Sequence, residues 1–151
     1  MSLRKLLRLN RWSIQINDYA VRDDDGSLLR DEGWKTIYKN IFGHIQATVT
    51  TSAKGKDDTT KAFGKIELES YYTIFHNYDD IVFKTNMRIL THHNPTKLIT
   101  FLPNGEVDFE IHKRDEIRVF EFLGSREAVG DRRNNLKHFE LYLKQVFRQH
   151  V

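Results

Sequence analysis

Short apolar runs with a period of two residues constrain the fold of this chain more than any other feature. Trp12, Ile14 and Ile16 alternate with Ser13 and Gln15, which is the pattern of a strand with one buried face. Further extended runs lie at 34–49, 66–75, 81–90, 97–102, 107–111, 117–122 and 139–144. Such a series, with turns between its members, predicts a mainly-β chain: a small antiparallel β-barrel or sandwich with long loops and an extended N-terminal arm.

Two segments have a second interpretation. The mixed spacing of apolar residues at 37–42 also permits a helical turn, and residues 136–148 can be aligned with a helical as well as with a strand period. We favour a strand up to Lys144.

Turn-forming residues separate the runs. Asp25-Gly26 and Asn104-Gly105 are strong turn signals, and we expect the second pair to join strands 97–102 and 107–111 as a hairpin in which both central residues have positive φ. The segment 124–135 is polar and is expected to be a loop.

These features predict one domain over residues 1–151. It divides into an arm at 1–10, first strands at 11–49, a mobile loop at 50–61, and remaining barrel strands at 62–148 with a hairpin insertion at 91–112. The loop holds only one apolar residue, Ala53. The chain has no cysteine, which excludes disulfides and Cys-ligated zinc and points to a reducing compartment. No stretch has the length of a membrane span or a secretory signal.

Histidines and carboxylates give no catalytic pattern. Neighbouring strand residues point to opposite faces, so His92 and His93 are not expected to share a metal without a turn between them. His44, His76 and His112 have no ligand spacing. We therefore expect no enzyme, no metal site and no cofactor.

Two carboxylates, Asp108 and Glu110, fall on one face of the expected hairpin strand. A metal-dependent nuclease would need a lysine two residues after the second acid, but that position is His112 and the lysine is Lys113. An exposed polar strand face explains these carboxylates better.

Charge is mild overall, with 24 Lys and Arg against 21 Asp and Glu. Cations gather in the N-terminal arm and at Arg132–Arg133, where they suit phosphates or a partner-facing surface. The arm carries Arg4, Lys5, Arg8 and Arg11. Aromatic residues near lysines, such as Tyr71, Tyr72 and Phe75 near Lys65 and Lys84, would also suit a small β-barrel that binds single-stranded nucleic acid.

Three stretches together resemble the small head–tail joining (head-closure, or stopper) proteins of long-tailed phages. The first is Leu-Asn-Arg-Trp-Ser-Ile-Gln at 9–15 followed by an acidic Asp-Gly turn and Trp-Lys-Thr-Ile-Tyr at 34–38. The second runs from Ser-Tyr-Tyr-Thr-Ile-Phe at 70–75 to Met-Arg-Ile at 87–89, and the third from Val-Gly-Asp-Arg-Arg at 129–133 to Leu143. The polar loop at 50–61 stands where the family has a Gly-Arg-Glu-type segment.

The resemblance implies a structural virion protein at the head–tail junction, made in the host cytoplasm. Its protomers would form a homo-oligomeric ring between the portal or adaptor and the tail proteins, closing the channel for packaged double-stranded DNA. By position, Lys54, Lys56 and Lys61 of the mobile loop would face that DNA. A tail-terminator role is the alternative at the same junction.

Ring closure needs two different contact surfaces on each protomer. The arm, through Leu3, Leu6, Leu7 and Leu9, suits docking onto a neighbour. A short surface helix that packs on its own barrel explains the same leucines equally well.

Overall fold

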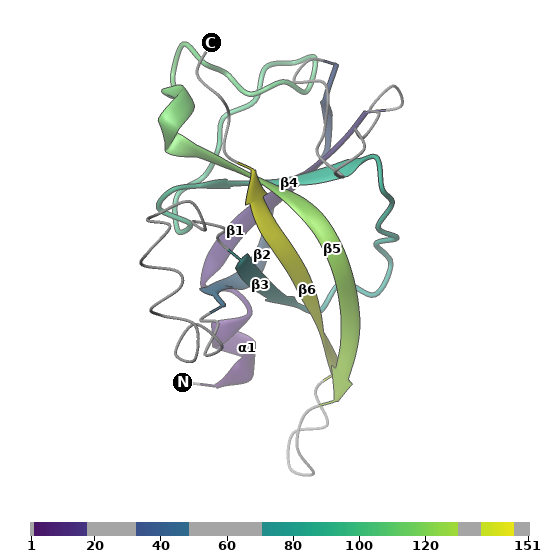
Figure 1. Ribbon diagram of the computed structural model, residues 1–151. Helices are drawn as coiled ribbons and strands as arrows, with labels where there is room; N and C mark the ends of the chain where they lie inside the picture. Colours follow the sequence, from purple (N-terminus) through teal and green to yellow (C-terminus); the bar gives the residue numbers. More distant parts are fainter. Residues whose placement is uncertain (1, 18–32, 49–70, 130–136, 147–151) are drawn as a thin grey trace, which may run out of the picture.

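The computed structural model of the chain describes residues 2–17, 33–48, 71–129 and 137–146 (Figure 1). In chain order its elements are α1 (Leu3–Leu6), β1 (Asn10–Ile16), β2 (Lys35–Ala47), β3 (Tyr71–His76), β4 (Met87–His92), the 3-10 helix η2 (Arg114–Glu116), β5 (Ile117–Val129) and β6 (Lys137–Val146). The mainly-β prediction is confirmed. Within these ranges no helix is long and apolar enough to cross a membrane.

The six strands of the described ranges close into one antiparallel barrel. Their order around it is β1-β2-β3-β6-β5-β4, and β4 pairs with β1 to complete the circle. Of the two predicted architectures, barrel and sandwich, the chain adopts the barrel. Strand β6 also shows that the ambiguous segment at 136–148 is extended over Lys137–Val146, as favoured above.

Large apolar side chains fill the barrel interior. The buried members of this core are Trp12, Ile14, Ile74, Met87, Ile89, Phe120, Leu141 and Leu143. The Trp12 indole N–H donates a hydrogen bond of 2.8 Å to the Phe42 carbonyl, so its polar atom is satisfied within the core. Side chains therefore occupy the interior of the barrel, as in other small barrels.

A bulge in β2 explains the mixed spacing that had permitted a helical turn. Tyr38 is paired with Ile14, and Ile41 with Trp12, so β2 has one residue more than β1 over this stretch. Tyr38 and Ile41 therefore both pack against the core. Asn40 takes up the extra residue with a φ of 51°, a conformation that asparagine tolerates better than most residues.

Residues 93–116, which we call the outer segment, leave the barrel after β4 and cover the outside of β4 and β5. A second buried cluster forms beneath them from Leu90, Ile99, Val107 and Val119. As a result, all six residues of β4 are buried. The predicted insertion therefore builds a second core.

The predicted hairpin within the outer segment is wrong in extent. Only a single bridge, between Phe101 and Val107, links its two arms, and residues 108–111 form turns. Phe109 and Ile111 are exposed, with 39% and 61% of their surface accessible. Apolar alternation at 107–111 thus does not produce a strand, since no sheet lies beside it.

The turn of this segment also differs from the expected type. The Gly105 N–H donates to the Leu102 carbonyl at 2.9 Å, and only Gly105 of the Asn-Gly pair has positive φ, at 89°. Pro103 fixes the first central position of a type I turn, and the left-handed glycine follows it. The Gly105 carbonyl accepts from the Thr36 N–H at 3.0 Å and from the Thr36 hydroxyl at 2.6 Å, which fastens the turn to β2.

The predicted polar loop at 124–135 begins instead as strand, because β5 continues to Val129. Beyond Glu121, β5 pairs with β6 but no longer with β4. Residues 125–127 are all exposed, so neither face of the strand is buried there and the sequence shows no alternation. The sequence from residue 124 to residue 129 is polar because this part of β5 is largely exposed, and its polarity does not indicate a loop.

Several predictions concern residues outside the described ranges. They are the Asp25-Gly26 turn, the loop at 50–61 with its three lysines, the strand start at 66–68, and the pair Arg132–Arg133.

Candidate functional site

The N-terminal arm begins as the helix α1 and then contacts its own barrel. Leu7 is 3% exposed and Leu6 is half-buried, whereas Leu9 is 42% exposed; the side chain of Leu3 lies outside what the structure describes. Burial of Leu7 agrees with the interpretation as a short helix that packs on its own chain. Docking of the arm onto a neighbour stays a prediction, with Leu9 as its accessible apolar side chain.

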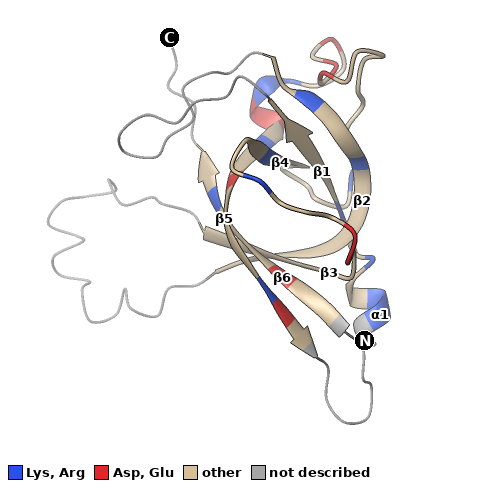
Figure 2. Cartoon of the chain, turned by 90° about the vertical axis from the view of Figure 1, so that its right-hand side faces the viewer, with Lys and Arg blue, Asp and Glu red and all other residues tan. Residues whose placement is uncertain are grey.

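Residues 123–129 of β5 present an open strand edge. Strand β4 pairs with β5 only over Ile117–Glu121, whereas β6 pairs with it from Val119 to Val129. On its other side, residues 123–126 and 128–129 have no strand partner within the described ranges. Figures 1 and 2 show this part of β5 continuing with β6 past the barrel, at the end where α1 lies. Unpaired N–H and C=O groups on such an edge can pair with another chain.

A cross-strand cluster holds the projecting part of β5 in register with β6. Arg126 donates to one Glu140 oxygen through Nη2 at 2.6 Å and through Nε at 2.9 Å. The Tyr142 hydroxyl donates to the same oxygen at 3.0 Å, and burial together with the Glu140 charge raises the pKa of Tyr142. Because Arg126 is solvent-exposed, the pair stabilises by less than about 1 kcal/mol, but it fixes which residues face each other.

Gly124 lies on this edge, and neither close packing nor a positive φ requires a glycine there. A methyl group at Gly124 would meet no atom within 4 Å, whereas one at Gly43 would come within 2.7 Å of the Trp12 indole nitrogen. Gly124 also lacks the positive φ of Gly33 and Gly105. A glycine inside a strand marks a bulge or the close approach of another backbone. The register shift at Phe122 and Gly124 gives the bulge, and the open space leaves room for the approach.

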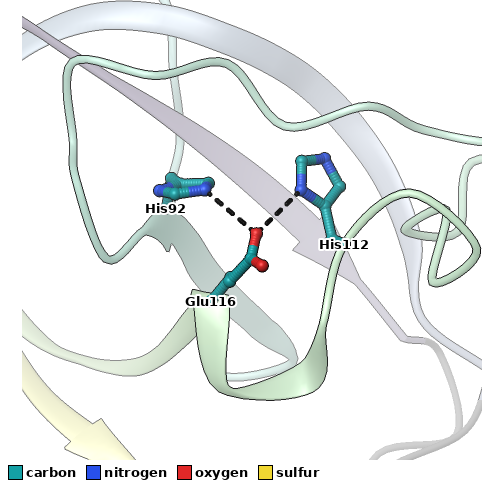
Figure 3. A group of neighbouring side chains, drawn as sticks. All are labelled: His92, His112 and Glu116. Atoms are coloured by element: carbon teal, nitrogen blue, oxygen red, sulfur yellow. Dashed lines mark ion pairs between the residues drawn. The ribbon is translucent and has the colours of Figure 1, made fainter.

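A second arrangement, on the opposite end of the barrel, joins His92, His112 and Glu116 (Figure 3). His92 ends β4, His112 belongs to the outer segment, and Glu116 ends η2. One Glu116 oxygen lies 3.4 Å from His92 Nε2 and 3.7 Å from His112 Nδ1. Both imidazoles are buried, and the carboxylate is 29% exposed. No local sequence pattern predicts this group, because 24 positions separate His92 from Glu116. The spacing of four between His112 and Glu116 is the only local signal.

Hydrogen bonds fix the protonation of both rings. The Asn94 N–H donates to His92 Nδ1 at 3.0 Å, and the Thr100 N–H donates to His112 Nε2 at 2.8 Å. These two nitrogens are acceptors and carry no proton, so in each neutral ring the proton lies on the nitrogen that faces Glu116. The cluster is therefore a carboxylate between two imidazole N–H groups.

The pKa shifts of His92 and Glu116 agree with a neutral His92 ring beside an ionised acid. Burial lowers the pKa of His92, and the neighbouring His93 lowers it further, against the opposing effect of Glu116. Burial acts to raise the pKa of Glu116, but hydrogen bonding to His92, to the Lys113 backbone and to His112 outweighs it, and the pKa of Glu116 is lowered.

The three ligand atoms lie within 4.8 Å of one another, close enough to test the group as a metal site. A metal-bound histidine needs its inner nitrogen free of a proton and usually donates its outer N–H to an acceptor. Here the outer nitrogens of His92 and His112 face backbone N–H donors. A metal bound at the inner nitrogen of either ring would move the proton to the outer nitrogen. The outer N–H would then face the backbone N–H of Asn94 or Thr100, so these residues do not fit a cation.

Other sequence-predicted chemistry is not assembled. His92 and His93 stack with ring centroids 4.7 Å apart, because the strand ends between them, but only His92 points to Glu116. Asp108 and Glu110 do not share a strand face: they lie in a turn, in which the Asp108 carboxylate accepts from the Glu110 N–H at 3.0 Å. The expected polar hairpin face is therefore wrong, and Asp108 serves the turn.

A cleft of about 360 Å³ lies beside this cluster, beneath the outer segment. Its main cation, Arg88, stacks on Trp34 at 4.3 Å and donates through Nε to Gln15 at 2.8 Å. Gln15 in turn donates to the Thr36 hydroxyl at 3.1 Å, which donates to the Gly105 carbonyl. These polar groups bind one another and tie the outer segment to the barrel, which is a structural role.

Comparison of the chain with models of protein families, with characterised proteins and with solved structures finds no match to any of them.

Proposed function

We propose that the protein is a non-catalytic structural protein of a phage virion, whose protomers form a ring at the head–tail junction between portal or adaptor and tail. The open edge of β5 around Gly124 is the observation that carries this proposal. The resemblance of residues 9–15, 70–75 and 129–133 to head-closure proteins supplies the biological setting.

Strand addition at the β5 edge gives the head-to-tail contact that a ring requires. One protomer would offer residues 123–129, and its neighbour would offer a different surface, so that rotation closes the assembly. The Arg126–Glu140 pair would keep the offered edge straight and in register. Residue Leu123, which is 49% exposed beside Gly124, adds apolar contact at the same place.

The known chemistry of the described residues favours a scaffold over an enzyme. The barrel interior is packed, the histidine–glutamate cluster does not suit a metal, and Arg88 and Gln15 of the cleft beside that cluster are already hydrogen-bonded within the chain. Lys54, Lys56 and Lys61 keep their proposed place facing DNA in the channel, on residues outside the described ranges.

Replacing Gly124 by valine tests the proposal. Valine meets no atom of its own chain, so the protomer should keep its fold. Its branched side chain would, however, fill the open space that we assign to the approaching neighbour. Wild-type protein should form closed rings in negative-stain images and in light scattering, and Gly124→Val should remain monomeric. Ser125→Ala, a neighbouring change without added bulk, is the control and should keep the rings. Equal assembly of wild type and Gly124→Val would contradict the proposal.

A tail-terminator role predicts the same ring. Binding to purified portal complexes rather than to tail tubes separates the two roles, and head closure is the one proposed here.

A further inference from the structure

A basic cleft of about 570 Å³ lies between α1 and the chain that follows β3. Its lining residues are Arg4, Lys5, Leu7, Arg8, Phe42, Asn77 and Tyr78. Figure 2 shows the basic residues of α1 in blue at the end of the barrel opposite η2. This position is separate from the Arg88 cleft and from the histidine–glutamate cluster.

The cations of the basic cleft have no acidic partners within the described part of the chain. No ion pair there involves Arg4, Lys5 or Arg8, and residues 1–17 contain no Asp or Glu. Asp79 and Asp80 follow the cleft and are exposed, but neither lines it. Three neighbouring positive charges thus share one concave surface on which no described acid forms an ion pair with them, and an acceptor-rich anion is the matching ligand.

The remaining polar groups of the cleft also donate. The Tyr78 oxygen accepts from the Phe42 N–H at 2.9 Å, which leaves its own O–H directed to other acceptors. Asn77 is exposed and adds an amide. The apolar part is largely covered, because the guanidinium groups of Arg11 and Arg8 lie over the Phe42 ring at 3.9 and 5.8 Å.

We propose that the basic cleft binds the phosphodiester backbone of nucleic acid. Phosphate oxygens are acceptors only, and arginine and lysine neutralise them with little need for apolar contact. A protein partner would instead require an apolar centre for its interface, whereas here Leu7 is buried and the Phe42 ring lies beneath two guanidinium groups. The inference rests on α1 and on residues 42 and 77–78, and it does not depend on ring formation.

Binding of a short fluorescein-labelled DNA duplex, measured by anisotropy across salt concentrations, tests the site. The slope of log K against log salt, in which K is the association constant, is negative. The variant Arg4→Ala/Lys5→Ala/Arg8→Ala should make it less steep by about 2.7, which is about 0.9 for each cation lost. Between about 50 and about 200 mM salt, wild-type protein should therefore lose about 40-fold more affinity than the variant.

The control is Lys84→Ala/Lys97→Ala/Lys113→Ala. It removes the same number of charges from exposed positions that do not line the cleft, and it should retain the wild-type slope to within about one contact. Circular dichroism confirms that both variants keep the β-barrel. An equal loss of binding in both would mean that net charge alone attracts DNA and would overturn the site.

A single-charge pair sharpens the test. Asn77→Asp puts a carboxylate into the cleft, whereas Asn104→Asp makes the same change in the distant turn, where its oxygen keeps the hydrogen bond from the Glu106 N–H. Only Asn77→Asp should weaken DNA binding. Polyglutamate that binds wild-type protein as tightly as DNA does would overturn the proposal in favour of an acidic protein segment.

Discussion

Replacing His76 by phenylalanine should remove a strongly acid-sensitive group from the barrel interior. His76 is 1% exposed, and its ring lies among aromatic rings, with centroids 5.2 Å from Trp12 and 5.4 Å from Phe139. Its Nδ1 accepts from the Tyr78 N–H at 3.1 Å, so the proton of the neutral ring is on Nε2. That atom has no hydrogen-bond partner among the described residues.

Burial, with a smaller contribution from His138, lowers the pKa of His76 from 6.5 to about 4. The folded pKa is below the unfolded one, so the unfolded chain takes up the proton first. The contribution to stability is therefore complete above pH 6.5 and is lost as the pH falls toward 4. A difference of about 2.5 pKa units corresponds to about 3 kcal/mol by pH 4, a large fraction of the stability of a small domain.

Phenylalanine loses the acceptor for the Tyr78 N–H, which costs about 1 kcal/mol at neutral pH, but it cannot be protonated. Phenylalanine also removes the unpartnered Nε2–H, which offsets this cost. The unfolding free energy of His76→Phe, measured in urea, should therefore rise relative to that of wild type by about 3 kcal/mol between pH 7.5 and pH 4. Trp12 and Trp34 are both buried, so tryptophan emission reports the unfolding. Parallel stability profiles from pH 7.5 to pH 4 would refute the assignment.

Two further changes probe the attachment of the outer segment. Glu116→Ala removes the carboxylate between the His92 and His112 N–H groups and should lower the urea midpoint. Zinc added to wild-type protein should leave the midpoint unchanged, and a zinc-dependent increase would contradict the tautomers assigned above. Asn40 binds both the N–H and the carbonyl of Ile99 at 2.9 Å, so Asn40→Ala, which also strains a φ of 51°, should cost about 2–4 kcal/mol in urea unfolding. Asn40→Gly should lower the unfolding free energy by less, because glycine adopts a positive φ without strain. An equal loss in the two variants would show that backbone strain at residue 40 does not contribute.

The sequence predicted the barrel because apolar side chains alternate with polar ones along its strands. Trp12, Ile14 and Ile16 alternate with Ser13 and Gln15, which are also buried but are polar and bond to β2, and this period needs no knowledge of tertiary structure. This alternation is lost in two strands of the barrel. Strand β4 is buried on both faces under the outer segment, and the projecting part of β5, at 123–129, is buried on neither, so one lacks polar alternation and the other resembles a loop.

The candidate sites were less accessible to sequence reasoning, for a reason that differs between them. The His92–Glu116 contact depends on how the outer segment folds back, which no local pattern encodes. Gly124 is one of eight glycines, and only the open space around it distinguishes it from Gly43, which the core requires. The cations of α1 were visible in the sequence. Only the fold shows that the residues lining the same cleft include the uncharged Asn77 and Tyr78 and no acid.

The two proposals make a joint prediction, because the basic cleft and the β5 edge lie at the same end of the barrel. In a ring, every protomer would present its cleft on one side, and several weak phosphate contacts would act together on one DNA molecule. Gly124→Val should then weaken DNA binding by loss of avidity while leaving the contribution of each protomer to the salt slope unchanged. The variant Arg4→Ala/Lys5→Ala/Arg8→Ala should do the reverse: rings should persist, and the salt dependence should fall. If the cleft variant also prevented ring formation, α1 would belong to the interface between protomers, and the cleft would have to be reassigned from nucleic acid to a neighbouring copy of the chain.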